Sequence, residues 1–193
     1  GGMNVPPAGF LAQVRELCDQ HNCLLIFDEV QTGIGRTGRW FGYQHEGVEP
    51  DIMTLAKALG SGFPIGACLA KPQIAAAFEP GNHASTFGGS HLACAVALET
   101  LAIIEDEGLV ANAERMGALL CELLSPAADD RIVEMRGRGL LRAVRFAEGA
   151  VDAKAVQERC RELGLVVNAL GADRLRLAPP VSVSEAEVRD AAA

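Results

Sequence analysis

An aspartate and a lysine are the residues whose types and surroundings best suit catalysis. Asp28 closes the apolar run 24–27 and is followed by Glu29, so two carboxyl groups stand at the end of an expected strand. Lys57 lies among small and apolar residues between Leu55 and Leu59. No acidic residue lies close to this lysine in the sequence, so an ordinary surface ion pair does not explain it.

The two side chains together indicate chemistry on a pyridine ring. A lysine in an apolar setting loses its proton more easily and can form a Schiff base with a carbonyl compound. An aspartate that faces a pyridine nitrogen keeps that nitrogen protonated, which makes the ring an electron sink. Asp28 and Lys57 therefore predict a site for pyridoxal phosphate.

Two other interpretations of the same stretch remain open. Residues 33–38 have the spacing G-x-G-x-x-G, which in dinucleotide-binding proteins follows a strand directly and opens a helix. Here Asp28 and Glu29 place negative charge where a pyrophosphate would lie, and the residues 39–42 are a poor helix start. The run 24–29 also resembles a Walker B strand, but that requires a partner phosphate-binding loop, and the sequence contains none.

Composition narrows the class of protein. The 193 residues carry a net charge of -8, which argues against a nucleic-acid partner because such proteins present a basic face. No apolar run approaches the roughly 20 residues of a membrane span, and no metal site is expected. The six cysteines are scattered, which is typical of small buried side chains in a reducing compartment, so a cytoplasmic location is expected.

The pattern of apolar residues predicts an α/β fold around Asp28 and Lys57. A helix over 10–21 precedes a strand over 23–27, which we expect to be buried on both faces because polar residues do not alternate along it. A helix followed by such a strand favours a parallel sheet. Further elements are expected as strands 52–55 and 65–70, helices 90–107 and 109–124, strands 132–136 and 140–146, a helix over 152–163, strands 165–168 and 175–177, and a last helix capped by Ser184.

The motifs that surround the two catalytic candidates resemble those of class III aminotransferases. They occur in the order of that family over essentially the whole chain. Within the class, the motif 62–67 is most similar to acetylornithine aminotransferases, and the ornithine, succinylornithine and 4-aminobutyrate enzymes are near alternatives. The matching segments are LIFDEVQTG at 25–33, GRTG at 35–38, PDI at 50–52, AKALG at 56–60, GFPIGA at 62–67, STFGG at 85–89, RGRGL at 136–140 and LRLAPP at 175–180.

For the cofactor, the resemblance implies a set of contacts to pyridoxal 5′-phosphate. Lys57 would bind its aldehyde group covalently and then act in proton transfer. Asp28 would pair with the pyridinium nitrogen, Val30 would pack on the ring face and Gln31 would approach the 3-oxygen. Glu29, between them, is counted with the cofactor-binding residues.

For the partner subunit and the substrate, the resemblance implies a shared site. Thr86 would bind the cofactor phosphate of the neighbouring subunit, and Ser85 would lie beside the substrate there, so a homodimer with shared active sites is expected. Arg176 would bind the α-carboxylate of glutamate or 2-oxoglutarate through its planar guanidinium.

The resemblance also implies a fold and a reaction. Residues 1–112 would be the C-terminal part of the large domain of a fold-type-I transferase, with a mainly parallel sheet, and residues 113–193 a small α+β domain. The expected reaction moves an ω-amino group, with N-acetylornithine as the first donor candidate and 2-oxoglutarate as acceptor, in arginine biosynthesis. Because the family's phosphate-binding half is missing, we expect an incomplete chain that is inactive alone. Another class III aminotransferase or a non-catalytic fragment are the alternatives.

Overall fold

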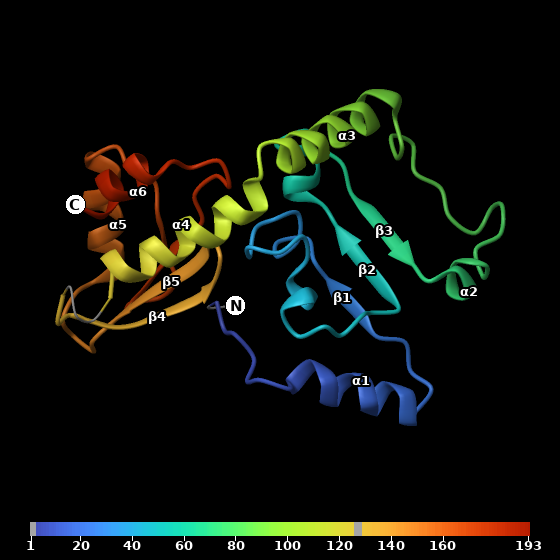
Figure 1. The fold of residues 1–193 in the computed structure, drawn as a ribbon, viewed down its shortest axis with the longest axis horizontal. Helices are drawn as coiled ribbons and strands as arrows, with labels where there is room; N and C mark the ends of the chain where they lie inside the picture. The colour runs from blue at the N-terminus through green and yellow to red at the C-terminus, as the bar shows by residue number, and fades with distance from the viewer. Residues whose placement is uncertain (1–2, 126–128) are drawn as a thin grey trace. The chain divides into compact units, whose positions relative to one another are not determined.

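The computed structural model describes residues 3–125 and 129–193, which form two compact units (Figure 1). The unit that carries Asp28 and Lys57, here the lysine unit, comprises Pro6–Gly35 and Arg39–Gly108. The other, here the arginine unit, comprises the described residues of Gly1–Val5, Arg36–Gly38 and Leu109–Ala193.

The lysine unit is built on a three-stranded sheet in the order β1-β2-β3, with β1 at Ile26–Asp28, β2 at Ile52–Leu55 and β3 at Ala67–Ala70. β1 and β2 are parallel, as predicted, whereas β2 and β3 are antiparallel. The connection 56–66 explains the antiparallel pair, because a parallel crossover needs a dozen or more residues, usually with a helix. Asp28 is the last residue of β1 and Lys57 follows β2, so both catalytic candidates lie at the carboxyl ends of neighbouring parallel strands.

The helices predicted before and after the three strands in the sequence are confirmed. α1 spans Phe10–Gln20 and α3 spans His91–Asp106. Ser90 caps the N-terminus of α3, because its hydroxyl accepts a hydrogen bond from the Ala93 amide. The remaining helical segments of the unit are η1 at Gly42–His45, η2 at Lys57–Gly60 and α2 at Pro72–Ala75.

One expectation for β1 is wrong, because the strand is not buried on both faces. Leu25 is 7% exposed, but Leu24 and Ile26 are 54% and 57% exposed. Within the described residues β1 pairs with β2 alone, so no further strand or layer encloses the alternate side chains of the run.

A buried carboxylate holds the lysine unit together. Asp51, just before β2, accepts hydrogen bonds from the Leu25 amide at 2.8 Å, from Arg15 of α1 at 2.8 Å and from Lys71 after β3 at 2.9 Å. These three donors, the Leu25 amide first and then Lys71 and Arg15, hold the pKa of Asp51 far below the usual range of an aspartate. The bonds connect α1 to all three strands and so support the sheet that ends at Asp28.

Asp51→Asn in the full-length protein is expected to destabilise the lysine unit by about 1–3 kcal/mol, because an amide cannot satisfy two cations and a buried N–H together. Faster hydrogen exchange of the Leu25 amide would measure the loss. The control is Asp19→Asn, since Asp19 binds the same Arg15 from a position 66% exposed and should change protection little.

The contribution of Asp51 also depends on pH. Its pKa is lower in the folded than in the unfolded protein, so its stabilisation is complete above the unfolded value of about 3.9 and is lost as the pH falls toward the folded value. Acid unfolding of Asp51→Asn should therefore lack part of the pH dependence of the wild-type protein. An identical pH dependence would contradict this role.

The arginine unit is an antiparallel sheet covered by helices. Its strand order is β4-β5-β7-β6, and the buried residues Leu140, Met116 and Val188 lie in the core between sheet and helices. The predicted capping box between Ser184 and Glu187 is present at the last helix. The strands are β4 Ile132–Arg138, β5 Leu141–Phe146, β6 Asn168–Ala169 and β7 Arg174–Leu177; the helices are α4 Leu109–Leu123, α5 Ala153–Glu162 and α6 Glu185–Ala192.

Two glycines let a helix and a hairpin turn of the arginine unit touch directly. A Cβ on Gly117 of α4 would collide with the carbonyl group of Gly139, and Gly139 itself has a φ of +49° in the β4–β5 turn. The turn thus packs with backbone against the helix. In the described ranges, no helix has the length and apolar character needed to cross a bilayer.

Candidate active site

The parallel pairing of β1 and β2 brings Asp28 opposite Thr54. One carboxylate oxygen, Oδ1, accepts hydrogen bonds from the Val30 amide at 3.0 Å and from the Thr54 hydroxyl at 3.4 Å. The structure records no partner for the second oxygen among the described residues. Asp28 is exposed, so its carboxylate is held in orientation by one oxygen while the other remains open to a ligand.

Lys57 begins η2, one residue after the end of β2, and has a backbone φ of +47°. This left-handed conformation costs a residue with a side chain on the order of 1 kcal/mol. The turn that follows holds it, because the Leu59 amide donates to the Ala56 carbonyl at 3.0 Å and the Ser61 amide to the Ala58 carbonyl at 3.2 Å. Strain of this kind is concentrated at functional sites.

The Lys57 amine is exposed and has no hydrogen bond or ion pair with any residue in the described part of the chain. By contrast, Lys71 of the same unit binds Asp51 at 2.9 Å. The strained Lys57 has an amine without a partner in the described part of the chain, and β1 ends nearby at Asp28, which has one carboxylate oxygen without a partner there. Such a pair suits a ligand with an aldehyde and a cationic ring nitrogen. The residues present therefore fit pyridoxal phosphate.

Val30, Gln31 and Glu29 lie on the loop that leaves β1, and their side chains differ in setting. Gln31 is exposed and Val30 half-buried, whereas Glu29 is 4% exposed. The Glu29 carboxylate accepts hydrogen bonds from the Thr32 hydroxyl and from the amides of residues 42 and 43, so it faces its own loop.

Ser85 and Thr86 lie on an exposed loop before α3. The Ser85 hydroxyl accepts a hydrogen bond from the Gly88 amide at 3.0 Å, and a Cβ on Gly88 would lie 2.7 Å from that of Ser85. This loop and the segment 64–68 line an open cavity of about 810 Å³. Phe87, next to Thr86, is 86% exposed.

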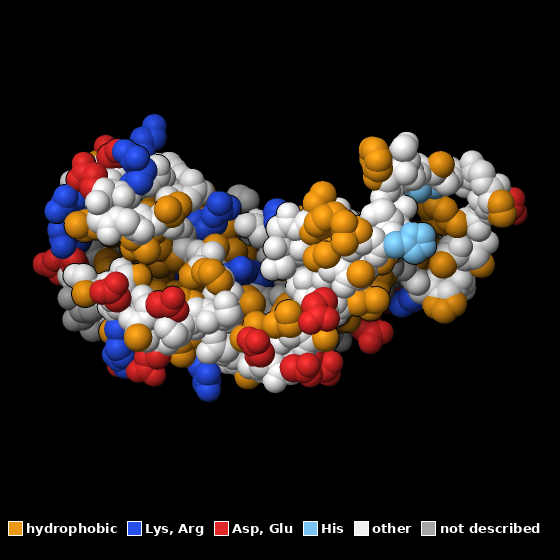
Figure 2. All heavy atoms as spheres, turned by 90° about the horizontal axis from the view of Figure 1, so that it is seen from above, with side chains coloured by type: hydrophobic (Ala, Val, Ile, Leu, Met, Phe, Trp, Pro, Cys, Tyr) orange, Lys and Arg blue, Asp and Glu red, His pale blue; other side chains and the backbone are white. Residues whose placement is uncertain are grey.

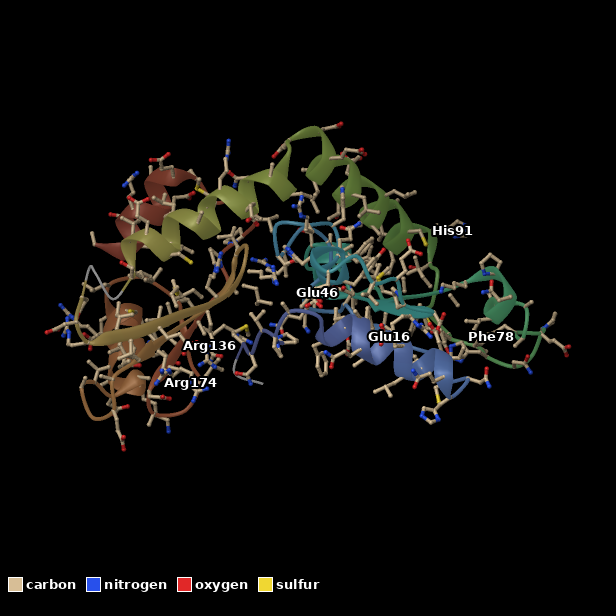
Figure 3. All side chains as sticks on the ribbon, turned by 60° about the horizontal axis from the view of Figure 1, so that its bottom comes forward. Glu16, Glu46, Phe78, His91, Arg136 and Arg174 are labelled. Atoms are coloured by element: carbon tan, nitrogen blue, oxygen red, sulfur yellow. The ribbon has the colours of Figure 1, made fainter. Side chains whose placement is uncertain are left out.

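Arg176 lies on β7 of the arginine unit, opposite Ala143 of β5 and Asn168 of β6. It is half-buried and has no hydrogen bond or ion pair with the described residues, unlike its neighbours Arg136 and Arg174. Figure 3 labels Arg136 and Arg174. Arg136 is bound by Glu134 and Asn4, and Arg174 by Asp173. The guanidinium of Arg176 is therefore available for an anion.

Sequence reasoning missed Thr54 as a site residue. Its hydroxyl contacts Asp28 only because the two residues are in register on parallel strands. The signal was present in the sequence, since the carboxyl ends of neighbouring parallel strands meet at one edge of a sheet.

Comparison with known proteins gives consistent results. The sequence matches the family profile described as "Aminotransferase class-III" over residues 1–193. An acetylornithine aminotransferase of Methanosarcina mazei is 47% identical over 188 residues, which cover 97% of this chain and 46% of that protein.

Solved structures are similar over nearly the whole chain. The ornithine aminotransferase of Toxoplasma gondii ME49 has a TM-score of 0.92 at 42% identity, covering 99% of this chain and 46% of its own. The acetylornithine aminotransferase of Elizabethkingia anophelis has a TM-score of 0.90 at 41% identity, covering 97% and 50%. The chain thus spans about half the length of the relatives it matches.

Proposed function

We infer, since this chain belongs to the class-III aminotransferases, that it forms part of a transaminase that moves an ω-amino group to 2-oxoglutarate. The fold is that of the pyridoxal-phosphate-dependent, fold-type-I aminotransferases it matches, and pyridoxal phosphate is the cofactor of this family. The observation that carries the proposal is the strained Lys57, whose amine has no partner among the described residues and which lies just beyond the strand that pairs with the strand of Asp28.

The site residues of the lysine unit have distinct tasks in this reaction. Bound pyridoxal phosphate supplies an electron sink for the bond between hydrogen and the amine-bearing carbon of the substrate. The Nζ of Lys57 holds the cofactor and moves the proton at that carbon, acting as general base and then as general acid. Asp28 keeps the ring nitrogen protonated with the oxygen that Val30 and Thr54 leave open, and residues 29–31 complete the cofactor-binding segment.

A second subunit of the full-length protein would contribute residues to the site. We propose that Thr86 binds the cofactor phosphate of the neighbouring subunit and that Ser85 lies beside the substrate there. The exposure of this loop, and of apolar side chains on the outer surface of α3, supports a homodimer (Figure 2). These apolar residues on α3 are Leu92, Leu98 and Ile103, and Phe87 is exposed on the loop before it. Such a patch on a protein surface marks an interaction site.

Arg176 is proposed to bind the α-carboxylate of the acceptor. Arg176→Ala in the full-length protein should raise KM for 2-oxoglutarate about 10- to 100-fold, the effect of one lost charge-assisted hydrogen bond pair. The matched control is Arg174→Ala, two residues earlier on β7 and already paired with Asp173. Equal changes in KM for both variants would exclude the specific role.

The amino donor is best tested directly. The relatives include an acetylornithine and an ornithine aminotransferase, so their names alone do not choose between donors. We propose N-acetylornithine, and with it a role in arginine biosynthesis. Steady-state kinetics of the full-length protein with N-acetylornithine, ornithine, N-succinylornithine and 4-aminobutyrate would test this. The highest kcat/KM with any other donor would overturn the choice.

Three further points belong to the proposal. Residues 1–112 would be the C-terminal part of the cofactor-binding domain and 113–193 the small domain, although the compact units divide after Gly108. The cysteines are free thiols, which supports a cytoplasmic location. The 193 residues alone should show no transamination, and turnover by this polypeptide without further chain would contradict that expectation.

A further inference from the structure

Glu29 is a buried carboxylate between two residues proposed to touch the cofactor. It is 4% exposed, whereas Asp28 before it is exposed. A buried carboxylate requires compensation by hydrogen bonds or an opposite charge. No Lys or Arg in the described ranges forms an ion pair with Glu29. Its burial is therefore sustained by neutral donors, and all of them come from its own loop.

These donors join the two ends of one loop. The Glu29 carboxylate accepts from the Gly42 amide at 2.9 Å, from the Tyr43 amide at 2.8 Å and from the Thr32 hydroxyl. The Glu29 carbonyl also accepts from the Gly33 amide at 2.9 Å. One side chain thus closes a loop that begins with Val30 and Gln31. Compact loops with their ends held together are a frequent carrier of function.

The fit around Glu29 leaves little room for another arrangement. A Cβ on Gly33 would lie 2.8 Å from the Glu29 carbonyl oxygen. A Cβ on Gly42 would lie 3.1 Å from the carboxylate and 3.2 Å from the Cβ of Thr32. Both positions therefore suit glycine, because a side chain would push the loop off the carboxylate.

The far end of the loop packs back on β1. The ring of Tyr43 stacks on that of Phe41, with centroids 5.8 Å apart, and lies 6.2 Å from that of Phe27. Phe27 is the residue before Asp28. Glu29 holds the Tyr43 amide, and the Tyr43 ring lies against Phe27. The loop is therefore fixed to the residue before Asp28 and to the residue after it.

We propose that Glu29 is a positioning residue, which fixes the backbone of Val30 and Gln31 for the cofactor through the loop it closes. This deepens and rests on the proposed function. The side chain acts by holding the Gly42 and Tyr43 amides, with all its acceptors facing the loop. Its loss should weaken cofactor binding and change the environment of the bound ring, while Lys57 remains able to attach to it.

The first test is Glu29→Gln in the full-length holoprotein. Glutamine keeps the size of the side chain but turns one oxygen into an N–H₂ donor, which would face the Gly42 or the Tyr43 amide. We expect cofactor affinity, measured by titration of the apoprotein, to fall about 10- to 100-fold. The absorbance of bound cofactor and its pH dependence should shift. Glu49→Gln, an exposed site with the same change of charge, is the matched control and should leave both unchanged.

A second pair of variants keeps the test decisive if Glu29→Gln does not fold. Thr32→Val removes the hydroxyl that donates to Glu29 at almost constant size, and Thr32→Ser restores it. Cofactor affinity should fall severalfold in the first and recover in the second. Wild-type affinity and spectrum in Thr32→Val, or a fall in thermal stability of Glu29→Gln without a change in affinity, would overturn the proposal.

The outcome also separates this inference from the proposed function. If the wild-type full-length protein binds no pyridoxal phosphate, the proposed function fails. If the wild type binds it and the Glu29 and Thr32 variants bind it equally well, only the positioning role fails.

Discussion

Lys57→Ala in the full-length protein should abolish transamination, with kcat reduced by about 10³-fold or more, since both covalent attachment and proton transfer depend on the Lys57 amine. The structure gives the physical reason. Lys57 is held at a φ of +47°, and its amine has no partner among the described residues, so the fold maintains a strained backbone to present an unpaired amine. Single-turnover kinetics with the amino donor would measure the loss of the chemical step itself.

The control for this prediction lies in the same sequence. Lys154 is an exposed lysine at the start of α5 in the arginine unit, and Lys154→Ala should retain wild-type kcat. Retention of activity in Lys57→Ala within a few fold of the wild-type value would contradict the assignment. Alanine at position 57 should not destabilise the fold by more than the small difference between two residues at positive φ.

Asp28→Asn is expected to have the second largest effect. Asparagine can still accept a hydrogen bond from the Val30 amide, so the loop should keep its conformation. A neutral amide cannot keep a pyridine nitrogen protonated, so the electron sink is lost. We expect kcat to fall on the order of 10²- to 10³-fold, the range seen when one preorganised electrostatic group is removed.

The measurement must separate charge from structure. Asp106→Asn, at the exposed end of α3, makes the same change in net charge and should leave kcat unchanged. The covalent attachment of cofactor to Lys57 should persist in Asp28→Asn, and its absorbance should change with loss of the ring proton. Full activity in Asp28→Asn would show that no aspartate–nitrogen pair exists there.

Much of the site could be predicted from local sequence because its positions follow element ends. An apolar run that stops at Asp28 predicts a strand with an acid at its tip, and β1 ends at that residue. The helices that flank the sheet were predicted for similar reasons, since their apolar spacing and caps are local. Lys57 could be singled out because its neighbours are small or apolar.

The remaining features depend on contacts between distant residues. The antiparallel direction of β3 follows from the length of its connection to β2 rather than from the strand's own residues. The exposure of Ile26 depends on which layers lie beside β1, which no local pattern encodes. The role of Glu29 depends on amides thirteen and fourteen residues further along the loop. An acid beside another acid gives no sign of which one faces inward.

The most direct test of the account is reduction of the full-length holoprotein with borohydride, followed by peptide mapping. The account predicts a single pyridoxyl group on the Nζ of Lys57, and none on Lys71 or Lys154. A label on another lysine, or the absence of a bound pyridoxyl group in a protein that folds normally, would contradict it.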